Sequence, residues 1–105
     1  MRDHTKLHAF TLADELAVMV YKVTRNFPKE ELYSLTTQMR RAAVSVASNI
    51  VEGCARTSEK EFLRFLDIAF GSLRELHYQY DLSVRLEYVK NDENSNFVNK
   101  IEETE

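Results

Sequence analysis

Apolar residues recur every three or four positions along most of this chain, which is the spacing of one face of an α-helix. The pattern predicts four helices, over residues 11–27, 34–52, 58–88 and 95–103. The connections between them are short, so consecutive helices are expected to lie antiparallel. We therefore predict an all-α fold, an antiparallel up-down-up-down four-helix bundle with a short fourth helix, as one domain over residues 1–105.

Residues at the helix boundaries support this division. Thr11 is the expected N-cap of the first helix, and Pro28 ends that helix because it lacks an N–H and disfavours the α conformation before it. Gly53 is the expected left-handed stop of the second helix. Ser58 and Glu61 have the spacing of a capping box at the start of the third.

Small and polar side chains suggest close packing of the second and third helices. Small residues are expected to let helices approach closely at Ala42, Ala43, Ala47, Gly71 and Ser72. Hydrogen bonds to the backbone or to a neighbouring helix are expected from Ser45, Ser48 and Asn49.

The apolar arcs of the second and third helices are wider than a small bundle requires. Val44 and Val51 lie beside the core stripe of the second helix, and Leu63 and Phe70 lie beside that of the third. The fourth helix is too short to cover the third. We therefore predict that these four residues form a subunit interface of a homo-oligomer. An unusually thick core within one chain is the alternative.

Composition narrows the class of protein. Two Gly and one Pro in 105 residues are too few for the turns of a β-sandwich. The longest run without a charge, residues 42–51, is about half of what a membrane-spanning helix needs. No apolar segment follows the N-terminal residues, and the single cysteine excludes an internal disulfide. We expect a cytoplasmic protein with no membrane partner.

The net charge of −3 is unevenly distributed. Residues 92–105 carry five acidic side chains and one basic one, so residues 1–91 have a net charge of +1. The middle of the chain is basic, and its candidates for contacting nucleic-acid phosphates are Arg40, Arg41, Arg56, Lys60 and Arg64. The alternative for Lys60 and Arg64 is a solvated face of salt bridges with neighbouring acidic residues.

Motifs for catalysis or cofactor binding are missing from the sequence. A di-iron bundle needs Glu-x-x-His, but Glu75 is followed three positions later by Tyr78. His4 and His8 have the spacing of metal ligands but no evident partner. Cys54 has no evident histidine base, and no glycine-rich phosphate loop is present. We predict no enzyme activity, no cofactor and no metal.

Several stretches carry a resemblance to a known family. They read FPKEE over residues 27–31, QMRRAAVSVASNIVEG over 38–53, SEKEFLRFL over 58–66 and AFGSLREL over 69–76. Over roughly residues 8–90 the sequence closely resembles the bacterial 23S rRNA intervening-sequence proteins, also labelled the S23 ribosomal protein family.

This resemblance implies an antiparallel four-helix bundle that assembles into a homopentamer. Family members are often encoded within insertions in 23S rRNA genes. A related group serves as the accessory protein of diversity-generating retroelements, and it binds nucleic acid and a reverse transcriptase. The family pattern falls here on Arg40, Arg41, Ser45, Asn49, Glu52, Gly53, Arg56, Ser58 and Phe62. Of these, Arg40, Arg41 and Arg56 are the better candidates for contacting nucleic acid.

The sequence departs from the family pattern at three positions. Ala47 stands where the family commonly has Pro, and Cys54 replaces an aromatic or small residue. Glu87 replaces the usual Gly before Tyr88, which leaves the end of the third helix less defined. The C-terminal helix is also shorter and more acidic than usual.

Together these observations predict a non-enzymatic homo-oligomer, with a pentamer as the expected state, that binds structured RNA or other nucleic acid. The alternative is an oligomeric protein–protein interaction scaffold, or accessory subunit, that binds no nucleic acid.

Overall fold

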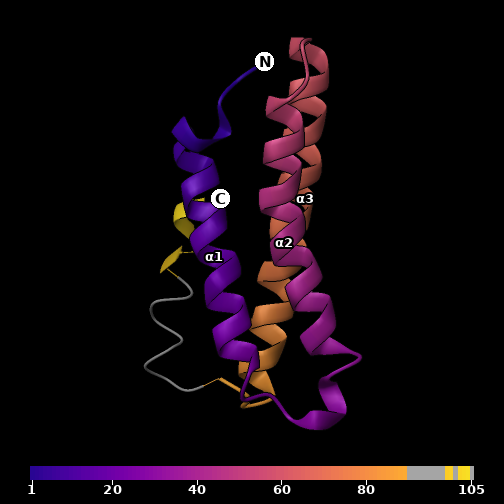
Figure 1. Ribbon diagram of the computed structural model, residues 1–105. Helices are drawn as coiled ribbons and strands as arrows, with labels where there is room; N and C mark the ends of the chain where they lie inside the picture. The colour runs from indigo at the N-terminus through magenta and orange to yellow at the C-terminus, as the bar shows by residue number, and fades with distance from the viewer. Residues whose placement is uncertain (90–98, 101, 105) are drawn as a thin grey trace.

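The computed structural model describes residues 1–89, 99–100 and 102–104, and all regular structure in these ranges is helical. Three long helices are formed, α1 (His8–Thr24), α2 (Leu35–Cys54) and α3 (Glu59–Arg85), with short 3-10 turns at His4–Lys6 and Lys29–Glu31. Consecutive long helices run in opposite directions (Figure 1). The predicted all-α fold is confirmed.

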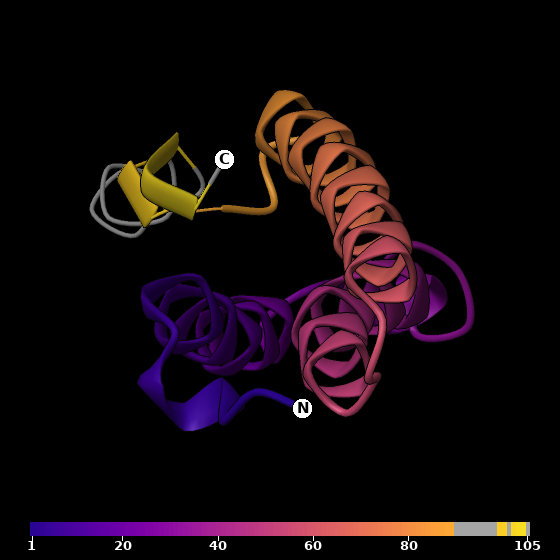
Figure 2. The same cartoon turned by 90° about the horizontal axis from the view of Figure 1, so that it is seen from above.

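The central helix of the three is α2. It packs against both α1 and α3, whereas no Cα atom of α1 lies within 8 Å of one in α3. Seen from above, the three helices occupy three corners, and the helical residues 99–100 and 102–104 lie at the fourth, beside α1 (Figure 2). Lys100 Nζ donates to Glu15 Oε2 at 2.7 Å and ties this corner to α1. Most of the predicted helix over 95–103 lies outside the described residues.

The core is built from the predicted apolar stripes. Its largest fully buried side chains include Leu16 and Val20 of α1, Met39 of α2, and Leu76 and Tyr80 of α3. Burying one such aliphatic side chain contributes roughly 1.5–3 kcal/mol. The inward face of α2 is therefore the surface on which the other helices are assembled.

The ends of α1 differ from the prediction. The helix begins at His8, one turn before the expected cap, and the Thr11 hydroxyl instead bonds the carbonyl of Leu7 at 3.5 Å. It ends at Thr24, whose carbonyl accepts from the N–H of Phe27. Because the following residue is a proline, Phe27 cannot continue the helix, and the last turn ends early.

The prediction that Gly53 ends α2 in the left-handed conformation is wrong. The helix continues to Cys54, and neither glycine has a positive φ. A Cβ at Gly53 would lie 2.9 Å from Cβ of Phe65 and 3.3 Å from the carbonyl oxygen of Phe62. Gly53 is therefore needed for the close approach of α2 and α3. Gly71, also expected at a close contact, instead has open space around its Cβ position.

The end of α3 lies at Arg85, three residues before the predicted end. The N–H of Tyr88 bonds the carbonyl of Ser83 and that of Glu87 bonds Val84, each at 2.9 Å, which is the Schellman pattern. Glu87 has φ 64°, so it occupies the left-handed position that glycine usually takes. Glu87 departs from the family pattern, but the end of α3 is nevertheless well defined.

Polar contacts join the helices at two further points. The hydroxyls of Ser45 and Ser72 lie 2.8 Å apart between α2 and α3, and Asn49 Nδ2 donates to the carbonyl of Ser45, as the sequence predicted. The Tyr88 hydroxyl donates to Glu31 Oε2 at 2.9 Å, and this bond raises the pKa of Tyr88. It fastens the end of α3 to the α1–α2 connection.

The two glycines allow a matched test of the packing. We expect Gly53→Ala to destabilise the protein by about 1–3 kcal/mol because its methyl group has no room. Gly71→Ala should instead stabilise it by up to about 1 kcal/mol through helix propensity alone. Chemical unfolding at one protein concentration measures both. Equal effects at the two positions would contradict the proposed close contact.

A second test concerns the stop of α3. We expect Glu87→Gly to stabilise the protein by about 1 kcal/mol because glycine relieves the cost of the left-handed backbone. Glu87→Ala removes the same carboxylate but keeps the strain, so it should give no comparable gain. Thermal unfolding of the two variants would show whether the backbone or the charge is responsible.

Candidate nucleic-acid interface

The predicted basic residues separate into two groups. Arg40 and Arg41 lie in the first half of α2, whereas Arg56, Lys60 and Arg64 surround the turn between α2 and α3. Sixteen positions along a helix correspond to roughly 24 Å, so Arg40 and Arg56 cannot contact the same phosphate. Each group has its own electrostatic environment.

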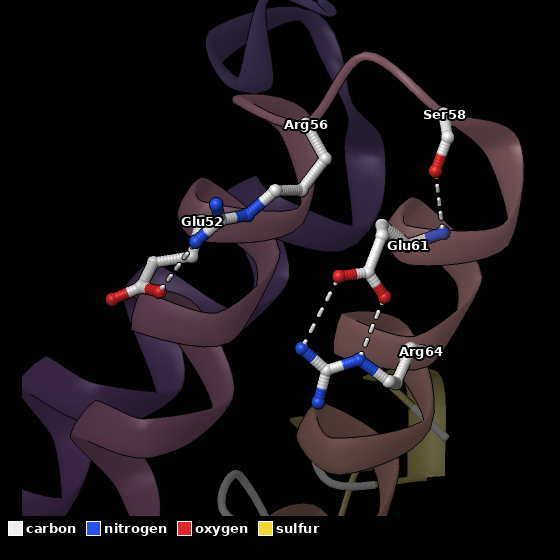
Figure 3. Close-up of polar contacts among 5 residues, drawn as sticks. All are labelled: Glu52, Arg56, Ser58, Glu61 and Arg64. Atoms are coloured by element: carbon white, nitrogen blue, oxygen red, sulfur yellow. Dashed lines mark hydrogen bonds and ion pairs between the residues drawn. The ribbon is translucent and has the colours of Figure 1, made fainter.

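Arginines at the α2–α3 turn are paired with acidic residues (Figure 3). Arg56 Nη2 lies 3.6 Å from Glu52 Oε2, and Arg64 Nε lies 2.8 Å from Glu61 Oε2. The guanidinium carbons of both arginines also lie over the ring of Phe65, at 4.8 and 4.7 Å from its centroid. These side chains are held by their neighbours on the protein.

The charge of this group is therefore balanced locally. The hydrogen bond and positive charge of Arg64 lower the pKa of Glu61, and the same contact raises the pKa of Arg64. Ser58 Oγ accepts from the N–H of Glu61, the predicted N-cap (Figure 3). Lys60 is exposed and has no ion pair with a described residue, but it stands between Glu59 and Glu61. The pairing of Arg64 fits the salt-bridged face that was the alternative interpretation, and Arg56 is paired with an acidic residue as well.

Arg40 connects α2 to α1. Its Nε donates to Thr24 Oγ1 at 2.9 Å, and Thr24 in turn donates to the carbonyl of Val20 at 2.7 Å. The guanidinium carbon lies 4.7 Å from the centroid of the Tyr21 ring. Thr24 is buried, so the contact between α1 and α2 includes a polar bridge, and both hydrogen bonds of the Thr24 hydroxyl are made within the protein. Arg40 is consequently held in a defined position at the surface.

Two adjoining hollows lie beside this bridge. The larger, of about 500 Å³, is lined by Tyr21, Thr37, Arg40, Arg41, Val44 and Ser45. The smaller, of about 320 Å³, is lined by Ala17, Val18, Tyr21, Lys22 and Arg25. Tyr21 belongs to both. We call this joint surface of α1 and α2 the cationic surface.

The cationic surface has an excess of positive charge. No Asp or Glu lines either hollow, although four basic side chains do. Lys22, Arg25 and Arg41 are exposed and form no ion pair with any described residue. Opposite charges therefore do not neutralise them, unlike Arg56 and Arg64. An anion approaching these hollows meets several cations on a concave surface.

The patterns in the sequence do not point to Tyr21, Lys22 and Arg25 as site residues. The sequence shows only that the middle of the chain has more basic than acidic residues. Helical spacing identifies the faces of one helix at a time, so it cannot show which residues of two helices come together. Only the packing of α1 on α2 brings Tyr21 beside Arg40.

The four predicted interface residues lie in different surroundings. Val44 is 42% exposed and belongs to the larger hollow of the cationic surface. Leu63 and Phe70 of α3 are 49% and 52% exposed, whereas Val51 is half-buried. Phe70 lines a separate small hollow that includes Thr104, next to the fourth corner of the fold. The structure thus divides these residues between α2 and α3.

The remaining chemical candidates are Cys54 and the N-terminal histidines. Cys54 is buried, and burial raises the pKa of its thiol, which disfavours the thiolate. The His4 ring packs edge-on against Phe10 at 4.8 Å. Within the ranges that the structure describes, no cluster of three His, Cys, Asp or Glu residues is arranged to hold a metal ion. None of the described helices combines the length and apolarity needed to span a membrane.

Comparisons with known proteins agree with this fold. Residues 5–105 match the family described as 23S rRNA-intervening sequence protein. No curated protein matches the sequence. A crystal structure of a protein of unknown function from the S23 ribosomal protein family of Bacteroides thetaiotaomicron is 25% identical, with a TM-score of 0.79 over 91% of this chain and 90% of that chain. The match over nearly the whole sequence shows that this chain belongs to the 23S rRNA-intervening sequence protein family.

Proposed function

We propose that this protein binds RNA, without catalysing a reaction, through the cationic surface of α1 and α2. The observation that carries the proposal is the set of four basic side chains around two hollows that no carboxylate lines. The family description, which refers to 23S rRNA, favours RNA as the nucleic acid. The cytoplasm is the compartment in which such a partner is available.

Phosphate contacts explain how a chain of net charge −3 binds an anionic polymer. Lysine and arginine side chains that meet phosphates release condensed counterions, and this release supplies most of the sequence-independent affinity. The effect depends on the local surface rather than on the overall charge, since charges beyond about 10 Å are screened at ordinary salt. Lys22, Arg25 and Arg41 supply unpaired cations at that range.

We also propose that the protein forms a homo-oligomer, with a pentamer as the expected state. Leu63 and Phe70 on α3 are exposed and apolar, and they lie on a different helix from Val51. The patch on α3 and the patch at Val51 differ from each other, which supports a head-to-tail contact. In this contact, α3 of one copy packs on the Val51 end of α2 in the next copy, and the repeated contact closes a ring. Such a ring would repeat the cationic surface and multiply a weak contact.

The RNA proposal predicts a steep salt dependence. With three or four phosphate contacts for each chain, the slope of log K against log salt should be about −2 to −3. Arg41→Glu should weaken binding about tenfold or more and make the slope shallower by about 1. Fluorescence anisotropy of a labelled RNA across a salt series measures both quantities.

Lys60→Glu is the matched control for this measurement. It makes the same change in net charge at another exposed, unpaired cation, but outside the cationic surface. We expect it to change the affinity little. If Lys60→Glu and Arg41→Glu weaken binding equally, the proposed surface is wrong. If RNA fails to bind even at low salt, the oligomeric scaffold becomes the better explanation of the fold.

The oligomer proposal predicts an effect at α3. Phe70→Glu should convert the assembly largely to monomers, because a charge would be buried in an apolar contact between copies. Tyr33→Glu, at a side chain that is 92% exposed, should leave the mass unchanged. Native mass spectrometry gives the stoichiometry of each variant. A wild-type protein that is strictly monomeric at micromolar concentration would contradict the proposal.

A further inference from the structure

We propose that the cationic surface selects single-stranded RNA over duplex RNA, because an unpaired base stacks on Tyr21 while the flanking cations hold the backbone. This inference rests on the proposed function and specifies the form of RNA that the surface takes.

Tyr21 occupies the centre of the surface. Its side chain is 43% exposed and is the residue shared by the two hollows. The Arg40 guanidinium lies over the ring at 4.7 Å and takes one face. Because the residue is partly exposed and lines both hollows, a base can reach the ring from them. Aromatic rings and arginine planes are the groups on which RNA-binding proteins stack unpaired bases.

The arginine over the ring is held in place before any ligand binds. Arg40 is tied to Thr24, which is buried and tied to the carbonyl of Val20 on the same helix as Tyr21. The stack therefore lies across the contact between two packed helices. Arg40 therefore has little side-chain freedom left to lose on binding, and this lowers the entropic cost of ordering the stack.

The cations are distributed on both sides of the ring. Arg41 lines the larger hollow on the α2 side, and Lys22 and Arg25 line the smaller hollow on the α1 side. A strand crossing the surface can contact phosphates before and after the nucleotide that stacks on Tyr21. The hollow of about 500 Å³ lies within the range typical of small-molecule sites, roughly 300–1,000 Å³. A duplex keeps its bases stacked inside and offers none to the ring.

Two hydroxyl groups in the larger hollow are already used by the protein. The Thr37 hydroxyl donates to the carbonyl of Leu32, and the Ser45 hydroxyl is paired with Ser72 and accepts from Asn49. These hydroxyls are therefore not free to read base edges, and the hollow offers mainly stacking and charge. Stacking of this kind tolerates any base, so we expect little dependence on sequence.

The test compares a single strand of about twelve nucleotides with a hairpin duplex of the same charge, each bound to wild type, Tyr21→Leu and Tyr21→Phe. Leucine keeps the bulk but removes the aromatic ring, whereas phenylalanine keeps the ring. We expect wild type and Tyr21→Phe to prefer the single strand. Tyr21→Leu should weaken single-strand binding roughly five- to a hundredfold and leave duplex binding unchanged.

A fluorescent purine analogue in the strand gives a second measurement. Stacking on Tyr21 should quench its emission in wild type and Tyr21→Phe but not in Tyr21→Leu. Tyr33→Leu, at an exposed tyrosine outside the surface, is the control and should behave as wild type.

The outcomes separate the two proposals. If Arg41→Glu abolishes binding while Tyr21→Leu has no effect, or if both RNAs bind equally, the stacking inference is overturned and the proposed function stands. If neither RNA binds wild type at low salt, the proposed function itself fails.

Discussion

The packing of α2 against both α1 and α3 is the constraint on which the rest of the structure depends. Both helices approach α2 closely, whereas no Cα atom of α1 lies within 8 Å of one in α3, so α2 sets how the other two helices are placed. Its buried residues include the small Ala42, Ala43 and Gly53 among larger apolar ones, and small side chains let neighbouring helices approach closely. At its C-terminal end, Gly53 lets the chain turn tightly enough for α3 to return along the same helix.

The basic side chains near the two ends of α2 have different electrostatic surroundings. Near the turn into α3, Arg56 and Arg64 are paired with acids one helical turn away, so their charges mainly stabilise the helices on which they lie. Near the α1 contact, Arg40 is shared between helices and Arg41 is left unpaired among other cations. Arginines that look alike in the sequence can therefore differ in their capacity to bind phosphate.

Basic side chains and exposed apolar side chains lie together on the cationic surface. Val18, Tyr21 and Val44 are each partly exposed among the basic side chains. For a protein partner this mixture would be an anchor with a charged rim, and for a nucleic acid it is a stacking platform with phosphate contacts. The positions of the cations on both sides of an aromatic ring favour the second interpretation, and the proposed self-association uses other residues, Leu63 and Phe70 of α3 and Val51 of α2.

The apolar periodicity by itself determined the all-α class, the three long helices and their core stripes, because burial of one helical face is a local pattern in the sequence. Ser58 as a cap and the Ser45–Asn49 contact were predictable for the same reason. Helix ends were less accurate, since Gly53 and Glu87 take backbone conformations that depend on close packing and on a Schellman stop rather than on residue type. The candidate site was only half predictable. Arg40 and Arg41 stood out in the sequence, but which cations are neutralised and that Tyr21, Lys22 and Arg25 join them were decided by tertiary structure, because charges interact through space and α1 meets α2 only in the folded protein.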